Sequence, residues 1–148
     1  MISLQGGPVV VDASVALKWV VDEEGSDAAA DLLDGRVLLA PPLILIEIAN
    51  ALWAMQRRGV ITPEDGADAL DRLLSAPWTM PTDASALVGQ AYRLARLLEH
   101  PVYDCVYLAL ALERQAPVVT ADRRFVASAS RDPDTAVFVR TLDGLKAD

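Results

Sequence analysis

Four acidic residues in this sequence stand in surroundings where acids are uncommon, and they are the residues that could do chemistry. Most of the 21 acids lie in polar clusters. In contrast, Asp12 and Asp122 each follow a valine-rich run, and Glu47 is the only charged residue in a long apolar stretch. Asp104 begins the most apolar segment of the chain. Removing a carboxylate from water costs several kcal/mol unless the charge is compensated, so each of these acids needs a partner.

The sequence offers few basic residues as that partner. Near the four acids only Lys18, Arg123 and Arg124 are close along the chain. Carboxylate oxygens are the ligands that hard divalent cations such as Mg²⁺ and Mn²⁺ prefer. We therefore expect the four acids to share a divalent metal, and we expect at least one of their pKa values to be raised by mutual repulsion when no metal is bound.

Each acid taken alone also has a purely structural interpretation. Asp12 and Asp122 could cap the helices that follow them, and Asp104 could be an acid favoured in the first turn of a helix. Glu47 could belong to an ion pair in the core. The metal hypothesis therefore depends on the four occurring together.

The elements that must position these acids alternate between strands and helices. Short apolar runs rich in valine or bounded by turn residues predict strands at residues 8–12, 37–40, 78–80, 117–120 and 136–140. Longer segments with capping and proline signals predict helices at residues 15–21, 26–33, 43–58, 62–74, 83–99 and 102–115. This alternation predicts an α/β fold with three layers, in which helices cover both faces of a central, mostly parallel sheet of four to five strands.

The predicted elements bring the acids toward one edge of the sheet. Sites in parallel sheets form beyond the carboxyl ends of the strands, where Asp12 and Asp122 lie. Glu47 and Asn50 are three residues apart and share one helix face. Asp104 lies near a helix N-terminus, which favours negative charge.

Length and charge limit the classes of function. The 148 residues fit a single domain, residues 1–148. A net charge of −8 argues against passive binding along a nucleic-acid backbone, but a divalent metal can invert the local charge. One cysteine, Cys105, allows no intrachain disulfide, and we expect neither a secretory signal nor a membrane span. We therefore expect a cytoplasmic protein.

Four motifs that contain these acids resemble the PIN-domain family, and most closely the VapC-type ribonuclease toxins of toxin–antitoxin pairs. The resemblance covers essentially the whole chain, with all four acids in the family's order. The motifs are Asp12-Ala-Ser-Val-Ala-Leu-Lys-Trp19, Glu47-Ile-Ala-Asn50-Ala-Leu, Tyr103-Asp104-Cys-Val-Tyr-Leu-Ala-Leu-Ala111 and Thr120-Ala-Asp122-Arg-Arg-Phe125.

The resemblance implies a metal-dependent endoribonuclease that hydrolyses RNA with a metal-activated water. The four acids would bind or orient Mg²⁺, or Mn²⁺ in its place. Ser14 and Thr120 match positions whose hydroxyls support the metal shell, and Asn50 matches a polar position beside Glu47. The same resemblance implies an antitoxin protein as partner and a homodimer.

Two other functions stay open at this point. A different magnesium-dependent phosphohydrolase could use Asp12 as its nucleophile, and a non-catalytic module could keep the PIN fold for binding. The single histidine, His100, stands before Pro101, where capping a helix end is the simpler role. One histidine and one cysteine also argue against a zinc site and a serine–histidine–acid triad.

Overall fold

The computed structural model describes residues 5–146. Within them lies a parallel sheet whose five strands follow the order β3-β2-β1-β4-β5. The strands are β1 Val9–Val11, β2 Leu38–Leu39, β3 Trp78–Thr79, β4 Val118–Thr120 and β5 Val139–Thr141. The central strands β1 and β4 are buried along their whole length, because apolar residues must fill both faces of a sheet that helices cover on each side.

Helices and a short 3-10 turn occupy the connections between the strands, and a second 3-10 turn follows β5. In chain order they are α1 Ala13–Ala16, η1 Leu17–Trp19, α2 Ser26–Ala30, α3 Leu43–Arg57, α4 Pro63–Leu74, α5 Ser85–Leu98, α6 Val102–Arg114, α7 Arg123–Ala129, α8 Pro133–Ala136 and η2 Asp143–Lys146. The Thr62 side chain accepts a hydrogen bond from the Asp65 amide at the start of α4, as its capping sequence predicts.

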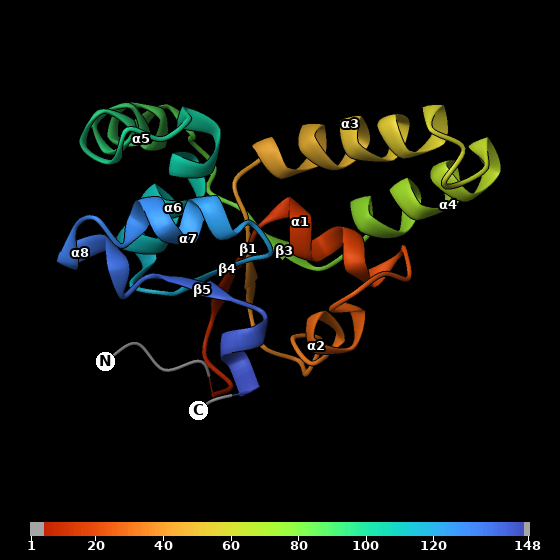
Figure 1. Cartoon of the computed structure of the whole chain (residues 1–148), viewed down its shortest axis with the longest axis horizontal. Coiled ribbons are helices and arrows are strands. Elements are labelled where there is room, and N and C mark those ends of the chain that lie inside the picture. Colours follow the sequence, from red (N-terminus) through yellow and green to blue (C-terminus); the bar gives the residue numbers. More distant parts are fainter. Residues whose placement is uncertain (1–4, 147–148) are drawn as a thin grey trace.

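The helices form two layers with the sheet between them. Figure 1 shows α1 to α4 on the right of the sheet and α5 to α8 on its left. Right-handed crossovers explain this division, because the chain moves in one direction from β1 through β2 to β3 and in the other direction from β3 through β4 to β5. The predicted three-layer α/β fold is confirmed, and every strand pairing is parallel.

The order of the strands creates a switch point between β1 and β4. These strands pair directly, with Val10 opposite Val118 and Val11 opposite Val119. The chain leaves β1 toward β2 and leaves β4 toward β5, on opposite sides of this pair. Such a reversal opens the crevice in which parallel α/β sheets bind ligands, so the residues directly after β1 and β4 occupy the position of a site.

The C-terminal third differs from the elements that the sequence predicts. The predicted last strand at residues 136–140 is wrong in its bounds, because Ala136 ends α8 and the strand runs from Val139 to Thr141. Asp132 caps α8 by accepting a hydrogen bond from the Asp134 amide, and proline follows the cap. Helix α7 was also not predicted, although Asp122 begins it as an N-cap.

One hydrophobic core joins the layers. Its members extend from Val9 in β1 to Leu142 after β5, and helix α6 contributes a run of side chains buried from Cys105 to Ala111. None of the described helices has the length and apolar character that crossing a membrane requires.

Candidate active site at the switch point

Asp12 is held at the end of β1 by hydroxyls from two neighbouring segments. Its Oδ2 accepts hydrogen bonds from Ser14 Oγ at 2.6 Å and from Thr120 Oγ1 at 2.8 Å. Thr120 Oγ1 also accepts the Asp122 amide at 3.0 Å, and Ser14 Oγ accepts the Ala121 amide at 3.0 Å. The residues after β1 and β4 are therefore locked together across the switch point, and Asp12 is only 5% exposed.

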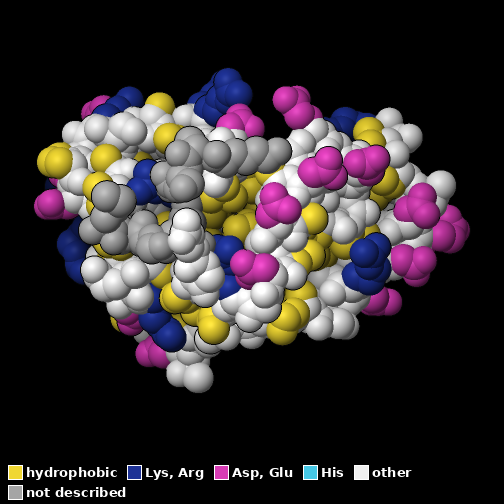
Figure 2. Space-filling view, turned by 90° about the horizontal axis from the view of Figure 1, so that it is seen from below, with side chains coloured by type: hydrophobic (Ala, Val, Ile, Leu, Met, Phe, Trp, Pro, Cys, Tyr) yellow, Lys and Arg dark blue, Asp and Glu magenta, His cyan; other side chains and the backbone are white. Residues whose placement is uncertain are grey.

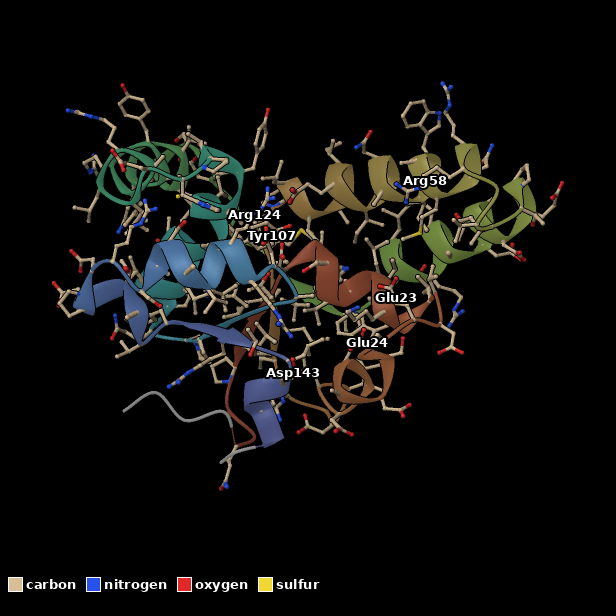
Figure 3. All side chains as sticks on the ribbon, viewed as in Figure 1. Glu23, Glu24, Arg58, Tyr107, Arg124 and Asp143 are labelled. Atoms are coloured by element: carbon tan, nitrogen blue, oxygen red, sulfur yellow. The ribbon has the colours of Figure 1, made fainter. Side chains whose placement is uncertain are left out.

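Glu47 enters the site from helix α3 and is held by a residue of α6. Its Oε1 accepts a hydrogen bond from Tyr107 Oη at 2.6 Å. Tyr107 is fully buried and lies near the centre of the molecule, between the helices on the two sides of the sheet (Figure 3). Burial and the charges of Asp12 and Glu47 raise the pKa of Tyr107 far above its usual value, so its hydroxyl stays protonated and donates.

Asp104 lies in the first turn of α6 and contacts the only histidine of the chain. Its Oδ2 lies 2.6 Å from His100 Nε2, and His100 Nδ1 lies 2.9 Å from Ser128 Oγ on α7. Asp122 is the N-cap of α7, where it accepts the Arg124 amide at 2.8 Å. Capping and a role in the site are compatible for Asp122, because this hydrogen bond uses Oδ1 alone.

Burial and, to a smaller extent, mutual repulsion raise the pKa values of Asp12, Glu47 and Asp104, which is the direction expected for carboxylates gathered at a metal site. Burial raises the pKa of Asp12, and the nearby charge of Asp104 raises it further. Burial also raises the pKa of Glu47, with smaller contributions from Asp12 and Asp104. The pKa of Asp104 is raised by burial and then by Asp122, against the lowering effect of its bond to His100. These interactions show that the structure brings the four predicted acids close enough for their charges to interact.

The donor set fits a hard divalent cation. Among residues 5–146, no lysine or arginine forms an ion pair with any of the four acids. Side-chain donors reach one oxygen each of Asp12, Glu47 and Asp104, which leaves the other oxygen of each carboxylate without such a donor in the described chain. No three His, Cys, Asp or Glu side chains of this part of the chain are arranged tightly enough to enclose one ion. Mg²⁺ commonly uses only one or two carboxylates and keeps several waters, so the chemistry of the site suits it.

The remaining sequence candidates lie at the margin of the acids. Asn50 is on α3 with Glu47 but is exposed, and its side chain makes no hydrogen bond to the described residues. Lys18 is bonded to Glu23 and to the Glu24 carbonyl. The structure therefore gives Ser14 and Thr120 clear contacts in the site and gives Asn50 none.

A cavity of about 320 Å³ lies beside the ends of β4 and β5, and it is not centred on the acids. Ala121 and Arg123 are the lining residues that come from the segment carrying Asp122, and Lys18 also lines the cavity. Arg123 is 85% exposed along its side chain and lies 3.5 Å from Asp143. The side chain of Arg124 has no ion-pair partner among residues 5–146. None of these three basic side chains forms an ion pair with any of the four acids in the part of the chain that the structure describes.

Two residues of the site were missed by reasoning from the sequence. The predicted capping role of His100 does not describe its main contacts, because both ring nitrogens face side chains. Its spacing of four residues from Asp104 was a weak signal, because His100 lies in the link before α6 and does not share a helix with Asp104. Tyr107 follows Asp104 by three residues, but its partner Glu47 is 60 positions away and no local pattern indicates that contact.

Two known proteins with similar sequences cover most of the chain. Ribonuclease VapC3 of Pyrobaculum aerophilum is 30% identical over 118 residues, which is 78% of this chain and 90% of that protein. Ribonuclease VapC12 of Mycobacterium tuberculosis is 28% identical over 123 residues, covering 81% of this chain and 91% of the relative.

Solved structures share the fold at lower identity. A crystal structure from Pyrobaculum aerophilum superposes with a TM-score of 0.69 at 22% identity, over 93% of this chain and 92% of that one. VapBC2 from Rickettsia felis, solved with a DNA fragment from its promoter, gives 0.64 at 16% identity over 90% and 98%. The family model of the PIN domain matches residues 9–129, a span that contains all four acids. The chain therefore belongs to the PIN-domain family.

Proposed function

We propose that this protein is a divalent-metal-dependent endoribonuclease and the toxin of a VapBC-type toxin–antitoxin pair. The observation that carries the proposal is the meeting of Asp12, Glu47 and Asp104 at the β1–β4 switch point, with raised pKa values and, within residues 5–146, no ion pair to a lysine or arginine. The two similar proteins named as VapC ribonucleases support RNA as the substrate class.

The chain's own residues bind and orient the reacting groups. Asp12, Glu47, Asp104 and Asp122 would bind or orient Mg²⁺ or Mn²⁺, directly or through its waters, and Ser14 and Thr120 fix the Asp12 carboxylate through Oδ2. Tyr107 fixes Glu47 in the same way. When bound, the cation supplies a Lewis acid for the scissile phosphate and lowers the pKa of the attacking water. No side chain has to act as a nucleophile, and the products should carry a 5′-phosphate and a 3′-hydroxyl.

The distribution of charge limits how RNA approaches. Figure 2 shows the face opposite the upper helices, where Asp and Glu side chains gather toward the side of α2 and α4 and Lys and Arg are scattered. RNA phosphates are repelled by such a surface. We infer that RNA approaches the carboxyl ends of the strands, where bound cations and Arg123 and Arg124 offset the negative charge.

The burial of Asp12 does not favour the alternative of a phosphohydrolase that uses this residue as its nucleophile. An aspartyl nucleophile must reach the phosphorus of its substrate, whereas Asp12 is 5% exposed and two hydroxyls hold its Oδ2. Hydrolysis of a small phosphomonoester, together with a phosphoryl-enzyme that is stable in acid, would support that alternative instead.

The experiment compares substrates and cations in one format. Purified protein is incubated with RNA, single-stranded DNA of the same sequence and p-nitrophenyl phosphate, each with Mg²⁺, Mn²⁺ or EDTA. We expect internal cleavage of RNA alone, only with metal, and with 5′-phosphate ends. Cleavage that continues in EDTA would contradict the proposal, and metal binding without hydrolysis of any substrate would favour a non-catalytic PIN module.

We also propose two protein contacts, both within the cytoplasm where the RNA substrate is. An antitoxin partner is supported by the VapBC2 structure. A cavity of about 420 Å³ between η1 and α4 would take a segment of it, with Val20, Val21, Val60 and Ile61 contacting its apolar side chains and the four charged lining residues contacting its polar ones. A homodimer is supported by Ile46 and Trp53 on α3, which are 70% and 54% exposed. Inhibition of cleavage by the product of an adjacent reading frame tests the first contact, and light scattering tests the second.

A further inference from the structure

His100 is restrained on three sides although it belongs to none of the four sequence motifs. It lies in the short link between α5 and α6, and its side chain is 8% exposed. Nε2 is 2.6 Å from Asp104 Oδ2, and Nδ1 is 2.9 Å from Ser128 Oγ. The ring stacks on Phe125 with centroids 5.4 Å apart and planes 16° from parallel. A ring held on both nitrogens and one face has a single orientation.

The contacts also determine which nitrogen donates. The carboxylate of Asp104 is an acceptor, so Nε2 must carry the hydrogen of that bond. The Ser128 hydroxyl can donate to Nδ1, and this selects the ring tautomer whose hydrogen is on Nε2. The hydrogen bond to Asp104 Oδ2 leaves Oδ1 with no side-chain donor among the described residues.

Helix α7 links this arrangement to the opposite side of the site. The helix begins at its N-cap Asp122 and carries Phe125 and Ser128 in its next turns. The same short helix therefore fixes Asp122 directly and Asp104 through the His100 ring.

We propose that His100 is a positioning residue for the metal site, which holds Asp104 Oδ2 so that Oδ1 faces the cation. This inference rests on the proposed function, because it takes Asp104 as a metal ligand. His100 acts through Asp104 and contacts neither cation nor RNA. Hydrogen bonds to ligating carboxylates orient them, and their loss commonly weakens metal affinity or activity by about 10–100-fold.

Two substitutions separate the hydrogen bond from the packing of the ring. His100→Phe keeps a flat ring against Phe125 but removes both nitrogens. His100→Gln removes the ring but keeps an amide donor at the ε position, within reach of Asp104. Mn²⁺ affinity is measured by titration calorimetry on wild type, both variants and Asp104→Asn, and RNA cleavage is measured across Mn²⁺ concentrations. Unfolding in EDTA shows which variants are folded.

We expect His100→Phe to bind Mn²⁺ about 10–100-fold more weakly, to need correspondingly more Mn²⁺ for cleavage, and to approach the wild-type rate at saturation. His100→Gln should lie much closer to wild type. Wild-type affinity in His100→Phe, or equally weak binding by both variants, would overturn the inference. If His100→Phe does not fold, Ser128→Ala serves instead, since losing the hydroxyl frees the ring; wild-type Mn²⁺ affinity in that variant would also overturn it.

The Asp104→Asn variant distinguishes this inference from the proposed function. If Asp104→Asn loses Mn²⁺ binding while His100→Phe retains it, only the positioning role is wrong. If wild type binds Mn²⁺ no better than Asp104→Asn, the proposed metal site itself is wrong.

Discussion

The hydrogen bond between Tyr107 and Glu47 connects α6 to α3 inside the site, and Tyr107→Phe removes it while keeping the ring. The bond is 2.6 Å long, and the tyrosine is fully buried. A hydrogen bond to a charged group contributes about 1.5–3 kcal/mol. We expect the lower part of this range, about 2 kcal/mol at neutral pH, because burial already raises the pKa of Glu47 and disfavours its charged form.

Denaturation with urea, followed by circular dichroism in EDTA, measures this loss. For a domain of this size, about 2 kcal/mol corresponds to a fall in Tm of about 4–8 °C. Tyr103→Phe is the matched control, because Tyr103 lies on the same helix but is 66% exposed. That substitution should change stability by less than about 0.5 kcal/mol.

A double-mutant cycle tests whether the loss comes from this contact. In a Glu47→Leu background the Tyr107 hydroxyl has lost the carboxylate to which it donates, so adding Tyr107→Phe should cost much less than it does in the wild type. A destabilisation of equal size in both backgrounds would show that Tyr107 and Glu47 are not coupled, and it would refute this account of how Glu47 is held.

Three further results are expected. Thr120→Val should destabilise the protein by about 1.5–3 kcal/mol, because its buried hydroxyl donates to Asp12; Thr79→Val at an exposed strand position is the control, and equal effects would contradict this explanation. The pKa values of Asp12, Glu47 and Asp104 are raised in the folded state, so without metal the folded protein binds more protons than the unfolded chain. The free energy of unfolding should therefore fall as the pH rises from about 4, the pKa of these acids in the unfolded chain, through their higher folded values. Urea midpoints that rise with pH over this range would contradict the expectation. Millimolar Mn²⁺ should raise Tm more at pH 7.5 than at pH 5, because metal and protons compete for these carboxylates, and a pH-independent shift would place the metal elsewhere.

The parts of the fold that depend on local sequence were predicted well. Buried valine runs indicated β1 and β4, and parallel topology then placed Asp12 and Asp122 at adjacent strand ends. The bounds of β5 were wrong, because the cap and proline signals of Asp132-Pro133 outweigh the strand propensity at Ala136. The prediction of one domain over residues 1–148 stays a prediction, and a single core from Val9 to Leu142 is consistent with it.

The contacts that hold the acids could not be predicted in the same way. Tyr107 meets Glu47, and His100 meets Ser128, across distances in the sequence that only the packed helices determine. Tyr107 and Ser128 are ordinary buried residues by type and spacing, so no local pattern indicates these two contacts. The acids themselves were detectable because a carboxylate in an apolar segment is costly wherever the chain folds.

The central claim is that the acids at the β1–β4 switch point are the site of RNA cleavage. The most direct measurement is the Mn²⁺-dependent cleavage rate of one RNA by wild type, Asp12→Asn, Asp104→Asn and Asp68→Asn, where Asp68 is an exposed acid of α4. The account predicts that Asp68→Asn cleaves like wild type, and that the first two variants lose cleavage while remaining folded. Cleavage that survives in folded Asp12→Asn and Asp104→Asn would contradict it.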